Sequence, residues 1–334
     1  MTSHVVPFGR AVHSYSLYGL SVDSDLQLPA LQIERPQRAD LMVHVGAPLD
    51  RPVATLHDAL EEGMMVSWRH LDATWRLRYD AADAHVLEFE IDEAGTRIDV
   101  RTSVADSEGD VANVLMGAGL AAALALRRVP VFHASAVVIG GRAILVAGRS
   151  GAGKSTLTAA LVAQGAALLS DDLAVLSLET SGVMVHPGAR MLRVYPASLA
   201  ALGGSVERAR LKLRRVFTLR NPEDKHFLDP DDLPGGRASV AAPVAAVYLL
   251  NARLRSIRTP ELVALPAHEA ALALIEHLYG SPFRMAAPVE QLSWCGSLSA
   301  RAPVIRVTAP DDLAAVTRTA AAILERTMRH GEFA

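Results

Sequence analysis

The feature that most limits the possible folds is a glycine-rich segment near the middle of the chain. Residues 148–155 are Gly-Arg-Ser-Gly-Ala-Gly-Lys-Ser, which matches the pattern G-x-x-x-x-G-K-[ST] at every fixed position. An apolar run at 142–147 precedes this segment, and residues 154–164 favour a helix that ends at Gly165. The apolar run suits a parallel sheet that is buried on both faces. The sequence therefore predicts an α/β fold in which this loop joins a central strand to a helix.

The same segment predicts a phosphate-binding loop, or P-loop. Glycines let the main chain curl until successive N–H groups point at one anion, and the start of the helix adds its dipole. The Lys154 amine can neutralise the β- and γ-phosphate oxygens, and the Ser155 hydroxyl can bind Mg²⁺ beside them. We expect ATP and Mg²⁺ as cofactors, although the motif does not separate ATP from GTP. The other residues expected to contact the nucleotide are Gly148, Arg149, Ser150, Gly151, Ala152, Gly153 and Thr156.

Two adjacent carboxylates, Asp171 and Asp172, follow the next predicted strand at 167–170. One helix and one strand separate them from the loop, so they fall at the carboxyl end of a neighbouring strand, where open parallel sheets bind ligands. Adjacent residues at a strand end point in different directions. We expect Asp171 to bind Mg²⁺ and Asp172 to take the proton from an acceptor hydroxyl; the reverse assignment remains open.

Composition excludes several classes of protein. The 33 Lys and Arg residues against 36 Asp and Glu residues give a net charge of −3, which disfavours a nucleic-acid partner. The one cysteine, Cys295, excludes a disulfide framework and a cysteine-rich zinc site, and we expect a packed thiol. The N-terminus shows no apolar signal-peptide core, and the longest apolar run, 114–126, is shorter than the ~20 residues of a membrane span. We therefore predict a cytoplasmic protein without a membrane partner.

Further motifs limit the class of nucleotide-binding protein. The chain has no L-S-G-G-Q signature of transporter ATPases, and its nearest match to the guanine-binding N-K-x-D, Asn-Pro-Glu-Asp at 221–224, lacks the lysine. Kinases that carry the same loop are therefore the class that the motifs leave open. His133 lies in Phe-His-Ala-Ser, at the start of the strand before the loop strand. A single histidine is most often structural, but the residues around this one favour a place in the site.

Several of these segments together resemble one family. The chain resembles the C-terminal domain of HPr kinase/phosphorylase in four segments: His133-Ala-Ser-Ala, the loop through Thr156, Gly165, and the run Leu-Leu-Ser-Asp-Asp at 168–172. They resemble still more the shorter HPr-kinase-related proteins of bacterial peptide-modification clusters, whose opening is similar to residues 18–29. The resemblance is clear over residues 15–35 and 110–200.

The resemblance implies a fold, an activity and residue roles. The fold would be similar to the nucleotide core of phosphoenolpyruvate carboxykinase, and the activity would be transfer of a phosphoryl group from ATP to a serine hydroxyl. Lys154 and Ser155 would serve the phosphates and Mg²⁺, His133 would lie near the transferred group, and Asp172 would be the acid/base. Some related members phosphorylate the C-terminal serine of lasso-peptide precursors, and the family also suggests a homo-oligomer.

The chain departs from the family pattern in one region. HPr kinases carry a second metal-binding Glu after the aspartates, whereas residues 186–196 here contain no Glu. The departure argues against HPr as the substrate and against a reverse phosphorylase reaction. A late arginine of the family has no clear counterpart. Lys225 and Arg237 are the candidates for a cation that stabilises charge in the transition state.

Two domains follow from this interpretation. Residues 1–109 are strand-rich, with period-two alternation at 85–91, and form the expected platform for a substrate or partner. Residues 110–334 form the expected kinase domain, which opens with a helix over 111–127 capped by Asp110. Further strands are expected at 131–139, 173–178, 244–250 and 304–307, with a hairpin turn at 140–141, and further helices at 269–279 and 311–329.

The favoured function is therefore an ATP-dependent serine kinase whose partner is a peptide or protein. Two alternatives remain open: a small-molecule kinase that phosphorylates a metabolite hydroxyl, and a non-catalytic nucleotide-binding sensor. The basic run 208–215 would contact an acidic peptide in the first case and form a lid in the second, although a solvated basic face is the simpler expectation. The identity of the acceptor does not follow from the sequence.

Overall fold

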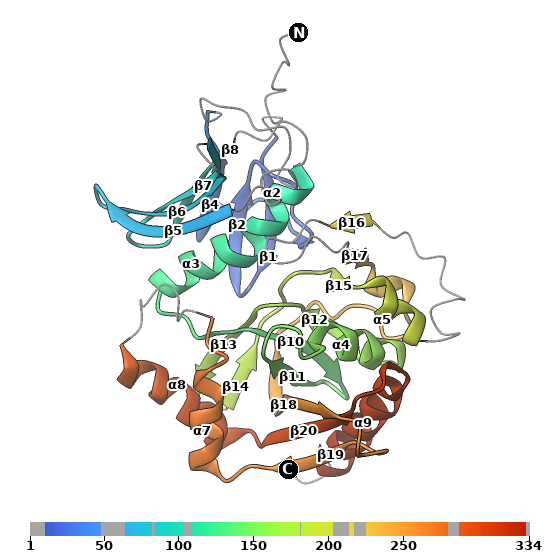
Figure 1. Ribbon diagram of the computed structural model, residues 1–334. Helices are drawn as coiled ribbons and strands as arrows, with labels where there is room; N and C mark the ends of the chain where they lie inside the picture. The colour runs from blue at the N-terminus through green and yellow to red at the C-terminus, as the bar shows by residue number, and fades with distance from the viewer. Residues whose placement is uncertain are drawn as a thin grey trace. The chain divides into compact units, whose positions relative to one another are not determined.

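The computed structural model describes most of the chain in two compact units. The described residues are 11–47, 64–81, 84–102, 108–180, 182–202, 214–216, 225–279 and 287–331. The first unit contains the residues up to Arg128, and the second contains most of the chain from Val129 onward. Each unit is built on its own large sheet (Figure 1).

The first unit contains an eight-stranded sheet in the order β3-β1-β2-β4-β8-β7-β6-β5. The strands are β1 (His13–Leu17), β2 (Leu20–Ser24), β3 (Leu31–Gln32), β4 (Leu41–Val45), β5 (Met64–Leu71), β6 (Thr74–Ala81), β7 (Ala84–Asp92) and β8 (Arg97–Thr102). The period-two pattern correctly predicted β7, whose residues Leu87, Phe89 and Ile91 are fully buried. β7 and β8 form an antiparallel hairpin, with Ile91 opposite Ile98.

One long helix belongs to the first unit rather than to the second. It runs as α2 (Glu108–Val114), a π-helical turn η1 (Leu115–Gly119) and α3 (Leu120–Leu126). Gly119 lies against the ring of Phe89, where an added Cβ would be 3.6 Å from ring carbons. The expected cap at Asp110 is wrong, because the helix already begins at Glu108. The division between units accordingly lies after this helix, and not between residues 109 and 110 as expected.

The second unit is organised around a nine-stranded mixed sheet. Its strands are β9 (Val131–Phe132), β10 (Ala134–Ile139), β11 (Arg142–Gly148), β12 (Ala167–Ser170), β13 (Ala174–Glu179), β14 (Gly182–Val185), β18 (Ala242–Leu254), β19 (Glu261–Ala264) and β20 (Val304–Pro310). Seven of them follow the order β12-β10-β11-β18-β14-β13-β9, while β20 pairs with β18 and β19 pairs with β20. The strand expected at 131–139 is split in two at His133. A smaller sheet contains β15 (Leu192–Val194), β17 (Lys225–Leu228) and β16 (Arg214–Val216).

Two hydrophobic cores lie on the two faces of the nine-stranded sheet. α4 (Lys154–Ala163) and α9 (Val316–Gly331) share one core with Ile144 and Val146 of β11. α7 (Ala267–Ile275) and α8 (Pro288–Arg301) share the other with Leu145 and Ala147. Successive residues of β11 thus point into opposite cores, as the period of a strand requires. The prediction that this strand is buried on both faces is confirmed.

Strand direction brings distant segments to one end of this sheet. β11 is parallel to β18, with Gly148 opposite Leu250, and β18 is parallel to β20, with Leu250 opposite Val307. β10 is antiparallel to both β11 and β12, so β12 runs in the same direction as β11. The carboxyl ends of β11 and β12 and the amino end of β10 therefore meet at the same end of the sheet.

The thiol of Cys295 and the lengths of the helices can be compared with the expectations from composition. Cys295 of α8 is fully buried, and burial raises the pKa of its thiol to about 12, which fits a packed thiol. Among the helices in the described part of the chain, none has the length and apolarity needed to cross a membrane.

Candidate active site

The glycine-rich segment forms a loop between β11 and α4, as predicted. The chain leaves β11 at Gly148, and α4 begins at Lys154 with Gly153 as its N-cap. Gly153 has a φ of 98°, in the left-handed region that glycine adopts without strain. Within the loop, the Ala152 N–H donates to the Arg149 carbonyl over 3.1 Å. The loop thus ends at the start of a helix, where N–H groups lack helical partners and favour an anion.

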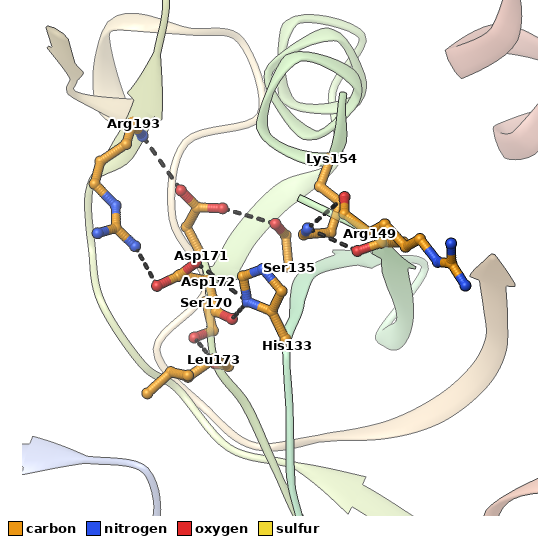
Figure 2. A network of polar contacts seen from close by, with 10 residues as sticks. His133, Ser135, Arg149, Lys154, Ser170, Asp171, Asp172, Leu173 and Arg193 are labelled. Carbon is orange, nitrogen blue, oxygen red and sulfur yellow. Dashed lines mark hydrogen bonds and ion pairs between the residues drawn. The ribbon is translucent and has the colours of Figure 1, made fainter. Parts of the chain in front are cut away.

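The side chain of Lys154 lies back over this loop (Figure 2). Its Nζ donates to the Gly148 carbonyl at 2.8 Å and to the Arg149 carbonyl at 3.3 Å. Burial lowers the pKa of His133 and of His277, and the charge of Lys154 lowers each pKa further. The ammonium group is therefore close enough to the neighbouring histidines to influence their protonation.

The two hydroxyl residues that follow Lys154 differ in their contacts. Thr156 Oγ1 shares a hydrogen bond of 2.8 Å with Ser198 Oγ, on α5 (Pro196–Ala201). Ser155 is half-buried, and its hydroxyl has no hydrogen-bond partner within the described residues. Ser155 therefore has the hydroxyl that is free to meet a metal ion or a phosphate oxygen.

Asp171 is buried and is held from two sides. Its side chain accepts a hydrogen bond from Ser135 Oγ of β10 at 2.7 Å through Oδ1, and one from the backbone N–H of Arg193 at 3.2 Å through Oδ2. These bonds tie β10, the end of β12 and β15 together. Each carboxylate oxygen keeps a second lone pair, so Asp171 can still bind a metal directly or through water.

Asp172 points in a different direction from Asp171 (Figure 2). Its φ of 73° lies in the left-handed region, which is uncommon for a residue other than glycine and frequent at functional sites. Asp172 Oδ2 is 2.6 Å from the Arg193 guanidinium, and Oδ1 is 3.3 Å from Nδ1 of His133. The expectation that the adjacent aspartates diverge at the strand end is therefore confirmed.

The neighbours of Asp172 stabilise its negative charge. Burial alone would raise the pKa of this carboxyl, but the surrounding cations, chiefly Arg193, outweigh burial and lower the pKa to about 2. Asp172 is therefore ionised at neutral pH and presents acceptor oxygens only.

His133 lies against Asp172 with a defined orientation. Its backbone N–H donates to the His277 carbonyl at 2.7 Å, and its ring meets the Tyr279 ring edge-on. Nδ1 is also 3.1 Å from the Asp172 carbonyl oxygen. Both neighbours of Nδ1 are acceptors, so Nδ1 carries the proton and Nε2 keeps a lone pair. Burial lowers the pKa of His133, which keeps the ring neutral at neutral pH.

Arg193 is a site residue that sequence reasoning missed. It contacts both aspartates, Asp171 through its backbone N–H and Asp172 through its guanidinium. Its side chain is only 18% exposed, so the charge is held in the site rather than in solvent. The available signal was the segment 186–196, which has no Glu but contains two arginines, Arg190 and Arg193.

Of the two cations that were expected to assist catalysis, Arg237 pairs with carboxylates other than Asp171 and Asp172. Arg237 pairs with Asp229 and Asp231, and its Nε donates to the Arg190 carbonyl at 3.2 Å. The charge of Arg237 is therefore engaged by the turn that follows β17, and Arg193 is the arginine that faces the aspartates. Lys225 begins β17, but its side chain lies outside the described residues.

The residues present fit a magnesium ion that is shared with a nucleotide. In the described ranges, no group of three or more His, Cys, Asp and Glu side chains could hold a metal by itself. Mg²⁺ is usually held by one or two carboxylates together with substrate phosphates and waters. The Ser155 hydroxyl and the Asp171 and Asp172 carboxylates are oxygen ligands of this kind.

Neither a family model nor a curated protein matches the sequence. Among solved structures, the Hpr(Ser) kinase/phosphatase from Coxiella burnetii is similar to this chain. The two proteins are 14% identical, and the match covers 60% of this chain and 98% of that chain with a TM-score of 0.30. A TM-score of this size carries no weight for fold or activity.

Proposed function

We propose that this chain is an ATP-dependent kinase that transfers the γ-phosphoryl group to a serine hydroxyl of a peptide or protein. The observation that carries the proposal is that a glycine-rich loop with its lysine, an ionised Asp172 and a neutral His133 occupy the same end of one sheet. Nucleotide binding requires only the loop. The ionised carboxylate and the neutral imidazole beside it favour an enzyme over a sensor, because they provide acceptors for the proton of an incoming alcohol.

The loop would hold the phosphates through charge and main-chain N–H groups. Lys154 Nζ lies at the Gly148 and Arg149 carbonyls, and its positive charge is therefore where the β- and γ-phosphate oxygens would lie. Mg²⁺, held by Ser155 and a carboxylate of the aspartate pair, would neutralise further charge on these oxygens. Phosphoryl transfer needs little more than positioning and charge stabilisation, which this set of groups can supply.

The chemical step joins the serine oxygen to the γ-phosphorus. The new O–P bond forms as the bond from the γ-phosphorus to the oxygen that bridges it to the β-phosphorus breaks, and the products are phosphoserine and ADP. The serine proton passes to Asp172. With a pKa of about 2, Asp172 is a weak base at the outset, so it first orients the hydroxyl and takes the proton only as the hydroxyl becomes acidic during transfer.

Arg193 would connect charge stabilisation with proton transfer. Its guanidinium, 2.6 Å from Asp172, is the cation that most lowers the pKa of this carboxyl. Beside the proposed base, the same guanidinium would also be available to stabilise negative charge on the transferring group. His133 keeps the carboxylate in place through Nδ1–H.

The acceptor is proposed on the basis of the resemblance of residues 133–172 to HPr-kinase-related proteins. It would be a peptide or protein with an accessible serine, and the specific candidate is the C-terminal serine of a lasso-peptide precursor. Residues 1–109 are the proposed platform for this partner, because they contain the other large sheet of the chain.

Incubation of the full chain with Mg²⁺ and γ-labelled ATP tests the proposal. Three acceptor sets are compared: peptides that end in Ser, the same peptides that end in Ala, and a mixture of hydroxyl-bearing metabolites. We expect label on the Ser peptides and not on their Ala counterparts. Label on metabolites only would make the chain a small-molecule kinase. Nucleotide binding without transfer to any acceptor would make it a sensor.

A further inference from the structure

The segment 276–279, which directly follows α7, contacts two parts of the candidate site. At its start, the Glu276 carboxylate accepts a hydrogen bond from the Arg149 guanidinium of the glycine-rich loop at 3.1 Å. The backbone carbonyl of the next residue, His277, accepts a hydrogen bond from the N–H of His133 at 2.7 Å. His277 is therefore joined to the loop through its neighbour and to His133 directly.

The pairing of this segment with β9 decides the face on which His277 lies. Phe132 and Leu278 are opposite each other in an antiparallel bridge, and both are buried in the same hydrophobic core. His133 and His277 are the next residues along the two paired segments, and successive residues of paired segments point to opposite faces. Both histidines are therefore on the face away from this core. On that face, His133 contacts Asp172.

The imidazole ring of His277 is buried without a hydrogen-bond partner among the residues that the structure describes. The residue is 9% exposed, and the causes that shift its pKa are burial and charge, with no hydrogen bond among them. Buried polar side chains almost always have a partner, and one that lacks a partner in the protein often has a functional one. The position of His277 in the site indicates that this partner belongs to a ligand.

The charges around the ring indicate what kind of ligand group it would meet. Burial lowers the pKa of His277 most, and the Lys154 ammonium is the charge that lowers it most strongly. His133 and Arg149 lower this pKa further, while the Glu276 carboxylate opposes them. The ring is therefore neutral at neutral pH, with one N–H donor and one acceptor. Because cations outnumber the single carboxylate, an anion with acceptor oxygens is the group that fits beside this donor.

We propose that the His277 ring donates a hydrogen bond to the terminal phosphate when a nucleoside triphosphate occupies the loop. The inference rests on the proposed function and adds a phosphate-binding residue to it. The ring lies close to Lys154, which meets the phosphates, and opposite His133, which contacts Asp172. The terminal phosphate, directed at Asp172, is therefore the one nearest to the ring. ADP has no such group, so the contact makes the site prefer the triphosphate to the diphosphate.

Calorimetric titration with two ligands tests the inference. The ligands are a non-transferable ATP analogue and ADP, both with Mg²⁺, and each is titrated into the full chain and its variants. His277→Leu removes the donor and should weaken the analogue about 10-fold or more, as expected for a lost hydrogen bond to a charged group. It should change the affinity for ADP by less than about twofold. His268→Leu, at an exposed position of α7, is the matched control and should change neither affinity.

His277→Gln separates the donated hydrogen bond from packing, because its amide keeps an N–H donor. It should bind the analogue within about threefold of the wild type. A Gln variant as weak as the Leu variant would count against a donated N–H. Equal weakening of both ligands in the Leu variant, or no weakening of either, would overturn the contact with the terminal phosphate. Wild-type chain that binds neither ligand would instead overturn the proposed function itself.

A measurement on the wild-type chain does not depend on whether the Leu variant folds. In chain with isotope-labelled histidine, the nuclear magnetic resonance signals of the His277 ring are those missing from the Gln variant. The analogue should shift these ring nitrogen signals much more than ADP does, because a donated hydrogen bond changes the shielding of the nitrogen. Equal shifts with the two ligands would overturn the contact.

Discussion

At the scale of single residues, the ion pair between Asp172 and Arg193 is the contact with the largest electrostatic consequence. The pKa of Asp172 is lowered from 3.8 to about 2 in the folded chain. A carboxyl with a depressed pKa stabilises the fold above its unfolded pKa, and this contribution is lost as the pH falls through the folded pKa. The pair therefore makes stability depend on pH in the window between about pH 4 and pH 2.

Asp172→Asn tests this linkage. We expect wild-type unfolding free energy, measured with urea at a series of pH values, to fall by on the order of 2 kcal/mol across this window because of Asp172. The Asn variant should lack this part of the slope. Parallel pH profiles for the two chains would contradict the pKa assigned to Asp172.

Arg193→Met tests the proposed role of the cation. We expect kcat for phosphoryl transfer to fall about 100-fold or more, as when one charge-stabilising donor is removed from an active site. The KM for ATP should change much less, because the loop still binds the nucleotide. Arg237→Met is the matched control, since Arg237 is engaged by Asp229 and Asp231, and it should keep most of the activity. Equal losses in the two variants would count against Arg193.

The residues of the candidate site differ in how far the sequence could reveal them. Gly148, Lys154 and the aspartates follow from local patterns, because a strand, a loop and a helix in sequence place them without any knowledge of distant contacts. Arg193 could not be found in this way. It reaches Asp172 because β15 lies beside the aspartates that follow β12, and this contact is a property of the tertiary fold.

At the scale of elements, β11 and β18 lie close together where the glycine-rich loop begins. Gly148 ends β11 opposite Leu250, and a Cβ at Gly148 would lie 2.9 Å from the Leu250 Cβ. Side chains at this distance cannot both fit without a backbone shift. The first glycine of the motif is therefore needed for strand packing, in addition to any contact with phosphate.

Gly148→Ala should separate these strands and destabilise the chain by about 1–3 kcal/mol, as overpacked cores do. Gly296→Ala, within α8, is the matched control. Its added Cβ meets nothing within 4 Å, and alanine is the better helix former by about 1 kcal/mol, so this variant should be slightly more stable. The two midpoints of thermal unfolding should move in opposite directions. A stabilising Gly148→Ala would show that the strands do not pack as described.

The elements themselves were predictable where hydrophobic periodicity is strong. β7, β11, β12 and α4 were expected within a residue or two of their observed bounds. α8 was not expected, because only Cys295 and Leu298 among its described residues are buried, whereas its apolar residues Val289 and Leu292 are exposed and give no clear amphipathic pattern. The antiparallel direction of β10 follows from the turn at Gly140 and Gly141, both with positive φ, but its insertion between β11 and β12 depends on long-range pairing.

At the scale of the whole molecule, the chain consists of two compact units, and the proposed nucleotide site lies within the second. A ligand that binds only the folded state stabilises the unit that contains its site. We expect ATP with Mg²⁺, at about 100 times its Kd, to stabilise the second unit by about 2.7 kcal/mol. Calorimetric scans should show one transition move and the other remain in place.

Two controls test whether this stabilisation of the second unit depends on the proposed site. Chelation of Mg²⁺ should reduce it, because the metal would be held jointly by phosphates and protein oxygens. Lys154→Ala should abolish it, because the ammonium that meets the phosphates is removed. A shift that survives both changes would place the nucleotide elsewhere in the chain.

The central claim is that a triphosphate in the glycine-rich loop has its terminal phosphate directed at Asp172. The most direct test is a crystal structure of the chain with Mg²⁺ and a non-transferable ATP analogue. We expect the β- and γ-phosphates within hydrogen-bond distance of Lys154 Nζ and of the loop N–H groups, with the γ-phosphorus facing Asp172 and Arg193. An analogue bound away from residues 148–155, or one whose γ-phosphate points away from Asp172, would contradict it.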